Sequence, residues 1–482
     1  MTLQISKKTI GFASLFLLLM NPIFAQTEKT WTLQDCVEQA LKSNITVQQQ
    51  ELQTKSIKAD YNQSKLAMLP NLNGSVSNNW QTGFAINPET NSAQNNQSFR
   101  TNSVGLNSSM TLFNGFQNSN NTRLQLSNLK ASEKELENTR NTITLNVCNA
   151  YLSVLQNIEL RNSAVSRVNA TRAQVERQKK MFELGSSNKS RYLQLKAQLA
   201  QEELAYINSD NIVIQSYLEL WLMIQVDPSE NSKIAIPDTK NLEVADETRT
   251  VEQIYEDFSK KSPDVLATQQ RIRSAEIQKY MALGGRSPRI TLGAGLNSFY
   301  TTQSKVGIGN PNFNNRTIGF WDNNGTLVQV YTPFPTYSSY ETSSLKTQFD
   351  QNLGSNVSLQ LSLPIFNGWN VNTNIQKSQI NNLNAKLNDQ QIKNNLFRSI
   401  SQSYTNFKAS RKRYEANQSN LEANKEAFDL ADKQFELGAM NMADYLNTKN
   451  SLIRAEADFT QAKYELIFRR KVLDFYAGKA LY

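Results

Sequence analysis

The chain has 482 residues, a formal net charge of +9, two cysteines and no histidine. Without histidine there is no Ser-His-Asp triad, no Cys-His dyad and no imidazole metal site, and two cysteines cannot build a cysteine-rich centre. Basic and acidic residues are mixed along helical stretches, which is typical of a solvated surface and not of a nucleic-acid interface. We therefore predict no catalytic residue, no metal site, no cofactor and no nucleic-acid partner.

The first 25 residues have the pattern of a signal peptide. Lys7 and Lys8 precede an apolar run over residues 10–20, and Ala25 is a small residue at a plausible cleavage point. The run is too short to cross a bilayer as a helix, and no longer apolar run follows it. The sequence predicts an exported protein without a transmembrane helix.

The rest of the chain consists of two copies of one unit. Residues 180–185 (KMFELG) return as 433–438 (KQFELG), and residues 112–116 (LFNGF) return as 365–369 (IFNGW), both at an offset of 253. Repeats of this kind define the architecture. We assign residues 26–230 to the first repeat, 231–249 to a linker and 250–482 to the second repeat.

Each repeat is predicted to begin with a helix. Thr32 with Asp35, and Thr250 with Gln253, have the spacing of a helix N-cap with an acceptor three positions on. The first run continues to Pro70 without an internal proline. The second helix is expected over residues 250–285, with an early break or kink at Pro263.

After these helices the hydrophobic period changes to two. Alternation predicts a strand pair over residues 72–112 and strands over 290–300 and 353–365, as in Val357, Leu359 and Leu361. Such strands occur in membrane barrels, with lipid outside and water inside, and also as half-buried strands of soluble sheets. The export signal and the flanking aromatic residues favour the membrane alternative.

The connection between the second pair of strands is 35 residues longer than its counterpart in the first repeat. The additional residues lie around 310–344, within a loop predicted over 301–352. Loop tips tolerate insertions, so we expect this segment at the outer, solvent-facing rim.

Long helices follow each pair of strands. We predict helices over residues 117–184 and 189–225 in the first repeat, and over 370–437 and 441–476 in the second. Apolar residues recur every seven positions, which indicates coiled-coil-like packing. The positions in the second copy are Ile400, Phe407, Tyr414, Leu421, Phe428 and Phe435. Gly185 and Gly438 would end the long helices at the tips of helical hairpins, and the acidic pair Glu202 and Glu203 is expected on a solvated face.

Four strands in one chain leave two unpaired edges, which do not persist in hydrocarbon. Several chains must therefore share one barrel. Three chains give twelve strands, whereas two give eight, which is too narrow for a conduit that receives twelve helices.

The order helix, strand pair, long helix, glycine turn and helix, repeated behind a signal peptide, resembles the TolC family of outer-membrane efflux proteins. The FNG motifs at 113–115 and 366–368 and the FELG motifs at 182–185 and 435–438 carry this resemblance. The resemblance implies an α+β membrane protein, a trimer with a 12-stranded outer-membrane β-barrel continued by a periplasmic α-helical barrel. It also implies an exit duct of a tripartite efflux or type I secretion system, working with a periplasmic adaptor and an inner-membrane transporter.

In this family, similar tips contact the adaptor and close the channel. The resemblance therefore suggests adaptor contacts at Gly185, Ser186, Ser187, Gly438, Ala439 and Met440. Asp444 matches a position that is commonly acidic, whereas Arg191 and Asn447 depart from the acidic pattern. Asp444 either pairs with a basic residue such as Arg191 of an adjacent hairpin or is a solvated surface carboxylate.

Two further alternatives remain open at this point. A trimeric coiled-coil surface adhesin or structural stalk would explain the heptads and the export, but not the two strand pairs. Cys36 and Cys148 are expected at similar heights, where they form either a disulfide or two buried thiols. The substrate, whether a drug, metal ion, peptide or protein, is not specified by the residues.

Overall fold

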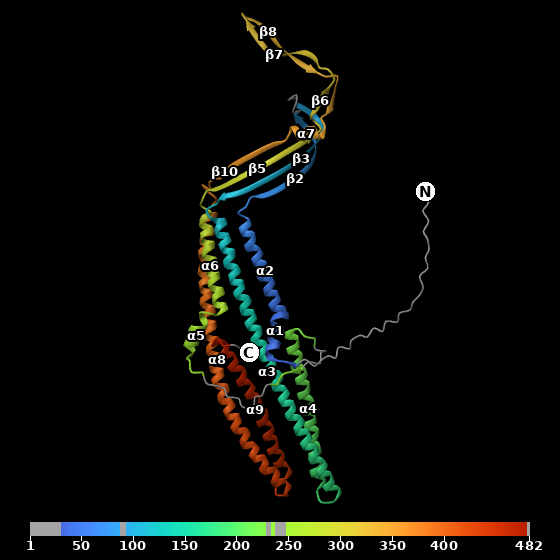
Figure 1. Cartoon of the computed structure of the whole chain (residues 1–482), viewed down its shortest axis with the longest axis vertical. Helices are drawn as coiled ribbons and strands as arrows, with labels where there is room; N and C mark the ends of the chain where they lie inside the picture. The colour runs from blue at the N-terminus through green and yellow to red at the C-terminus, as the bar shows by residue number, and fades with distance from the viewer. Residues whose placement is uncertain (1–29, 87–92, 228–232, 237–246, 480–482) are drawn as a thin grey trace, which may run out of the picture.

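The computed structural model describes residues 30–86, 93–227, 233–236 and 247–479, so the predicted signal peptide lies outside the described residues. The molecule is elongated, with a curved sheet above a layer of long helices and two helical hairpin tips at the far end (Figure 1). No helix in the described ranges is both long and apolar enough to cross a bilayer.

The helices repeat in register. The first repeat contains α1 (Leu33–Ser43), α2 (Ile45–Leu66), α3 (Gln117–Glu183) and α4 (Lys189–Ile224). The second contains α5 (Val251–Ser259), α6 (Pro263–Gly284), α8 (Asn370–Glu436) and α9 (Met442–Tyr476). Helix α6 repeats α2 at an offset of 218, and α8 repeats α3 at 253. Both α3 and α8 have 67 residues, which gives each a length of roughly 100 Å.

The first helical segment of each repeat is two helices and not one. Asn44 adopts an extended conformation (φ −63°, ψ 128°), and its side chain accepts from the Thr46 amide at 3.0 Å, which ends α1 and caps α2. The expectation of an unbroken first run is therefore wrong, because an asparagine cap ends a helix without a proline. The early break expected at Pro263 in the segment 250–285 is confirmed, since Pro263 begins α6 and residues 260–262 are not helical.

The main sheet has four antiparallel strands in the order β10-β5-β3-β2. These are β2 (Asn71–Ile86), β3 (Ala93–Phe113), β5 (Arg289–Thr301) and β10 (Gly354–Ser362). The predicted strand 353–365 is too long, because Pro364 has no amide proton to continue the ladder. Within the described residues the outer edges of β2 and β10 have no partner strand.

The insertion is more ordered than the predicted loop over 301–352. Strand β6 (Lys305–Ile308) pairs with β9 (Ser339–Thr342), and β7 (Asn312–Asn323) pairs with β8 (Thr326–Thr336) beyond them. A short helix, α7 (Leu345–Gln351), returns the chain to β10. The two hairpins project from the far end of the sheet (Figure 1). The side chain of Gln348 fixes α7, because it accepts from the Thr301 amide at 2.9 Å and donates to the Ser343 carbonyl at 2.9 Å.

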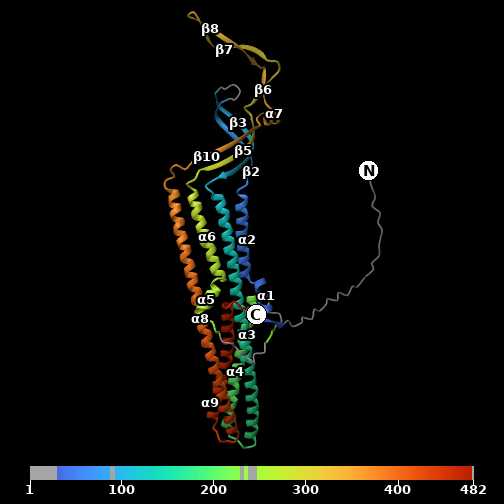
Figure 2. The same ribbon diagram turned by 60° about the vertical axis from the view of Figure 1, so that its left-hand side comes forward.

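The helices form one layer whose order changes at mid-height (Figures 1 and 2). Near the sheet the order is α2, α3, α6, α8, and near the tips it is α4, α3, α9, α8. Helices α6 and α9 thus occupy, one above the other, the position between the two long helices. A two-residue parallel pair, β1 (Thr30–Trp31) with β4 (Lys233–Ile234), lies at this mid-height level.

The seven-residue pattern is confirmed as core. Val147, Val154, Ile400, Phe407 and Tyr445 are all 0% exposed. They belong to three clusters, one at mid-height in each repeat and one near the hairpin tips. The core therefore runs along the helices as a seam and does not form a globular centre.

Candidate functional site

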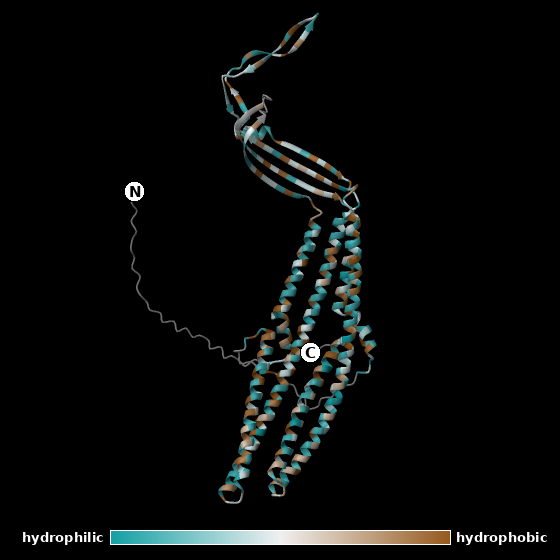
Figure 3. Ribbon diagram, turned by 180° about the vertical axis from the view of Figure 1, so that it is seen from behind, coloured by the Kyte–Doolittle hydropathy of each residue, from teal (hydrophilic) through white to brown (hydrophobic). Residues whose placement is uncertain are grey.

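One face of the main sheet is apolar and exposed. Cross-strand pairing places Val104 opposite Val76, and Leu359 opposite Leu292, so their side chains share this face. Val76 is 80% exposed and Val357 is 78% exposed. Figure 3 shows hydrophobic and hydrophilic residues alternating along each strand. An apolar face of this kind requires a covering that is not water.

The opposite face of the sheet is mainly asparagine, serine, threonine, glutamine and glycine, with Phe299 opposite Ser103 toward one end. It is crowded, because a Cβ atom on Gly295 would lie 2.6 Å from Asn356 Oδ1, and one on Gly105 would lie 2.9 Å from Asn297 Oδ1. Glycine is therefore required where asparagine side chains from neighbouring strands meet. The sequence pattern predicted that this face is polar. The close glycine–asparagine contacts depend on the pairing register of the strands, which the pattern did not give.

The FNG turn brings the first long helix into backbone contact with α6. A Cβ atom on Gly115 would lie 2.3 Å from the Gly284 carbonyl oxygen, and Gly115 has a φ of +65°. Its counterpart, Gly368, has a similar φ of +62° but nothing within 4 Å. The same turn is thus packed in the first repeat and open in the second.

The long helix ends in the same way at both hairpin tips. Gly185 and Gly438 have φ values of +73° and +74°. The Ser186 amide donates to the Met181 carbonyl at 2.8 Å, and the Ala439 amide donates to the Gln434 carbonyl at 2.8 Å. This is the Schellman arrangement, in which a left-handed residue ends a helix.

The other predicted tip residues differ in their surroundings. Ser187 accepts a hydrogen bond from the Gln178 side chain, and Met440 packs against the apolar cluster around Tyr445. Ser186 and Ala439 are exposed. The tips therefore present mainly backbone and small side chains to solvent.

Tyr445 joins the two hairpins. It is fully buried, its ring stacks on Phe435 at 4.4 Å, and its hydroxyl accepts from Gln174 Nε2 of α3 at 2.7 Å. Burial raises the pKa of the Tyr445 hydroxyl, so it stays neutral at physiological pH.

The three gate candidates are not brought together within one chain. The Arg191 guanidinium lies over the Phe435 ring, 5.4 Å from its centre. Asp444 accepts from Asn441 Nδ2 at 2.6 Å, and Asn447 is exposed one turn further along α9. In the described part of a single chain Asp444 forms no ion pair with Arg191, so their pairing between adjacent hairpins stays a prediction.

A buried ion pair near the tips was not predicted. Glu202 and Lys449 are 3.0 Å apart, with side chains 5% and 7% exposed, and the Thr171 hydroxyl donates to Glu202 at 2.5 Å. The expectation of a solvated Glu202 is wrong, whereas Glu203 is partly exposed and pairs with Arg172 at 2.8 Å. The missed signal was Lys449, which follows Tyr445 by four residues on the heptad seam.

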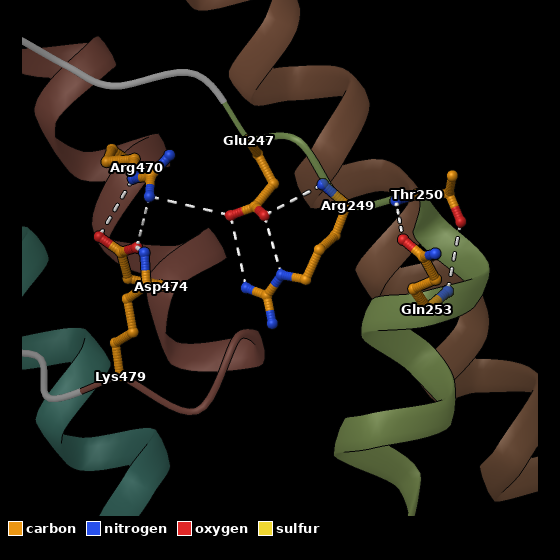
Figure 4. A network of polar contacts seen from close by, with 7 residues as sticks. All are labelled: Glu247, Arg249, Thr250, Gln253, Arg470, Asp474 and Lys479. Carbon is orange, nitrogen blue, oxygen red and sulfur yellow. Dashed lines mark hydrogen bonds and ion pairs between the residues drawn. The ribbon is translucent and has the colours of Figure 1, made fainter.

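A second ionic network fastens the chain at mid-height (Figure 4). Glu247, just before α5, accepts from Arg249 Nε at 2.9 Å and lies 3.8 Å from Arg470 of α9, which pairs with Asp474 at 2.9 Å. The hydrogen bond from Arg249 lowers the pKa of the Glu247 carboxyl. The network ties the end of the linker to the last turns of α9, next to the capping box of Thr250 and Gln253.

Cys36 and Cys148 are buried thiols that are not joined to each other, so the disulfide alternative is not realised in this structure. Burial raises the pKa of the Cys148 thiol to about 11, which keeps it protonated and unreactive. Within the described ranges no group of three or more acidic or cysteine side chains is placed to hold a metal ion.

The chain is similar to known outer-membrane channels. It is 21% identical to the outer membrane protein TolC of Escherichia coli K12 over 336 residues, which is 68% of this chain and 60% of that protein. The structure of CusC superposes with a TM-score of 0.73 at 16% identity, covering 93% of this chain and 92% of that one. The Campylobacter jejuni CmeC outer membrane channel gives a TM-score of 0.70 at 18% identity, covering 92% and 84%. These superpositions show the shared fold.

The outer membrane efflux protein family matches residues 36–224 and 254–479 of this chain. The two matched segments are the two repeats, and together they span far more than half of the sequence. The α+β fold with a helical barrel expected from the resemblance agrees with the structural neighbours. This chain belongs to the outer membrane efflux protein family and is an outer-membrane protein.

Proposed function

We propose that three copies of this chain form the outer-membrane exit duct of a tripartite efflux or type I secretion system. The observation that carries this proposal is a four-stranded sheet with an exposed apolar face, a polar face and two unpaired edges. Such a sheet is stable in a bilayer only when its edges are paired, and pairing in a ring of three gives twelve strands.

The conduit acts passively. Its apolar sheet face contacts lipid, its polar face lines a water-filled passage, and the helices prolong the passage into the periplasm. Selectivity then depends on pore width and lining polarity, as in other channels, while the energy comes from the inner-membrane transporter. A surface adhesin or structural stalk has no support from the family.

The hairpin tips are the proposed contact with the periplasmic adaptor. Gly185 and Gly438 shape the two tips, with Ser186, Ser187, Ala439 and Met440 beside them. Arg191, Asp444 and Asn447 lie within the next turns, where they would act on the passage of solutes through the closed end.

The assembly is tested by extracting the full chain from outer-membrane fractions. We expect an oligomer of three chains that migrates as a monomer only after heating, and stepwise conductance in planar bilayers. A water-soluble monomer without conductance would contradict the proposal.

The gate residues are tested separately. Asp444→Ala and Arg191→Ala are each expected to raise single-channel conductance or antibiotic leakage without changing the amount of oligomer. If neither change alters either measurement, the two residues have no gating role, and the duct itself is unaffected.

A further inference from the structure

A groove of about 580 Å³ lies between α3 and α6, directly below the point where β3 leads into α3 (Figures 1 and 2). Gly115 and Gly284 line it and are in backbone contact, so neither has a side chain that could fill it. Phe116 lies at its upper end, and Arg123 lies two helical turns further along α3. The other lining residues are Ser119 and Asn120 of α3, and Tyr280, Leu283 and Ser287 at the end of α6.

The upper end of the groove is continuous with the apolar face of the sheet. Phe113, at the end of β3, pairs with Ile290 of β5, and Ile290 pairs with Leu361 of β10. These three side chains lie on the apolar face, because cross-strand partners share a face. The ring of Phe116 packs edge-on against Phe113, with ring centres 5.4 Å apart. Whatever covers the apolar face therefore also covers the upper end of the groove.

The groove also lies at one end of the apolar band. At the other end Tyr300 pairs with Asn102 on the same face, next to Trp80 on β2. Phe113 is eleven positions beyond Asn102 along β3. At about 3.4 Å per residue and a tilt of about 40°, these positions span roughly 28 Å across a membrane, and the apolar band of outer-membrane barrels is about 25 Å tall with aromatic residues at both ends. In the proposed duct the groove thus lies at the boundary between lipid and periplasm.

The lower end of the groove carries a cation without an anionic partner. Arg123 is exposed and forms no ion pair or hydrogen bond with any described residue, Glu276 further down α6 included. Residues 61–132 contain one acidic residue, Glu89, between β2 and β3, and residues 277–388 contain three, all in the insertion or α7. The helix ends next to the sheet carry cations instead, namely Lys65, Arg123, Lys279, Arg286 and Lys377.

We propose that this groove binds one acidic phospholipid of the periplasmic leaflet in each chain. The proposal rests on the proposed duct, which places the apolar face of the sheet in lipid. An acyl chain lies along this face and against Phe116, and the phosphate reaches Arg123.

The reach of the arginine agrees with this placement. Arg123 lies about 10 Å below Phe116 along α3, and side chains on a helix point toward its N-terminus, which for α3 is the sheet. A long arginine side chain directed that way extends to the headgroup layer, where its planar guanidinium donates two hydrogen bonds to a phosphate. The surrounding cations add attraction for an anionic lipid, which a zwitterionic lipid does not match.

The site is tested on the purified full-length oligomer in a mild detergent. Phosphatidylglycerol and phosphatidylcholine with the same acyl chains are added separately, and the bound lipid is counted by native mass spectrometry. We expect phosphatidylglycerol to bind more tightly, up to one molecule per chain. Arg123→Gln should weaken its binding about fivefold, the factor expected for one cation at an anionic lipid surface.

Two variants serve as controls. Arg123→Lys keeps the charge and should retain most of the binding of phosphatidylglycerol. Lys180→Gln removes an exposed cation from the same helix, near the hairpin tip, and should leave this binding unchanged. Phe116→Ser should weaken the binding of both lipids, because it removes the apolar upper end of the groove.

Equal binding of the two lipids, or equal binding by Arg123→Gln and the native protein, would overturn the proposal. Displacement of the lipid by inorganic phosphate at millimolar concentration would overturn the assignment to a lipid, since the groove would then take phosphate from any source. An intact, conducting oligomer in these experiments would leave the duct standing. A monomer without conductance would overturn both.

Discussion

The two long helices have the same length and the same place in their repeats, yet they are buried very differently. Helix α3 buries seventeen side chains and α8 buries seven. The reason is their neighbours, since α3 has helices on both sides and α8 on one. Burial here follows from position in the layer, and the periodicity that both helices share does not determine it.

The two repeats also use different side-chain contacts at equivalent positions at mid-height. In the first repeat Trp221 stacks on Tyr217, with ring centres 5.7 Å apart, and contacts the tilted ring of Trp31 at 5.9 Å. The equivalent positions in the second repeat are Arg249, Arg470 and Asp474, the ionic network of Figure 4. Equivalent positions in the two repeats are thus stabilised by aromatic contacts in one case and by ion pairs in the other. Only the stability that comes from the ion pairs should depend on pH.

The largest expected difference between the repeats is at the buried ion pair. Lys449→Ala leaves Glu202 buried without its partner and should lower the free energy of unfolding by about 3–5 kcal/mol. The equivalent lysine in the first repeat, Lys196, is exposed, so Lys196→Ala should change the free energy of unfolding by less than about 0.5 kcal/mol. Far-UV circular dichroism during urea unfolding in detergent measures both. Equal effects would mean that the pair is not buried in the assembled protein.

Next in size is a pair of substitutions on the long helices. Leu155 of α3 is 2% exposed, so Leu155→Ala should cost about 2–5 kcal/mol of unfolding free energy through the cavity that it leaves. Its counterpart on α8 is the exposed Lys408, where alanine should cost less than about 0.5 kcal/mol. The same unfolding assay compares them, and a large loss at Lys408 would show that the open side of α8 is covered more deeply than its contacts within one chain indicate.

The mid-height networks should differ in their pH dependence. The pKa of Glu247 is lowered in the folded protein, so the carboxylate stabilises the fold above the ordinary carboxyl pKa of about 4, and this contribution is lost as the pH falls through the folded value. Glu247→Gln should lower the thermal midpoint at pH 7, with a free-energy cost of about 1–3 kcal/mol, and match the native protein at low pH. Thermal scans from pH 7 to pH 3 measure this.

The control for this experiment lies in the first repeat. Trp221→Phe perturbs the aromatic stack without changing a charge, so its effect on the thermal midpoint should be the same at every pH. A difference between Glu247→Gln and the native protein that stays as large at pH 3 as at pH 7 would contradict the ionic explanation.

The smallest expected effect concerns the tips, where the two repeats should behave alike. Gly185→Ala and Gly438→Ala place a side chain in the left-handed region, at a cost of about 1 kcal/mol each. Neither site has an atom within 4 Å of the added Cβ, so strain of the backbone is the whole effect. Thermal midpoints of the two variants should agree, and unequal shifts would show that one tip is packed in the assembled protein.

Much of this architecture could be read from the sequence because it depends on local spacing. The offset of 253, the glycines at 185 and 438 and the heptad positions such as Phe407 fixed the hairpins and their core. The alternation in Val357, Leu359 and Leu361 likewise assigned an apolar face before any strand was placed. The break at Asn44 escaped prediction, since an asparagine cap competes with helix continuation only when its side chain finds a partner, here the Met223 carbonyl at 3.0 Å.

The sequence by itself determined the repeat, the periods and the turn residues, because each of these is set by the steric preferences of a few adjacent residues. Tertiary structure decided which charges are buried and which face is left open. Glu202 is buried because Thr171 and Lys449 approach it from two other helices, and Lys412 is exposed because α8 lies at the edge of the layer. Such outcomes depend on residues hundreds of positions apart, which no local pattern brings together.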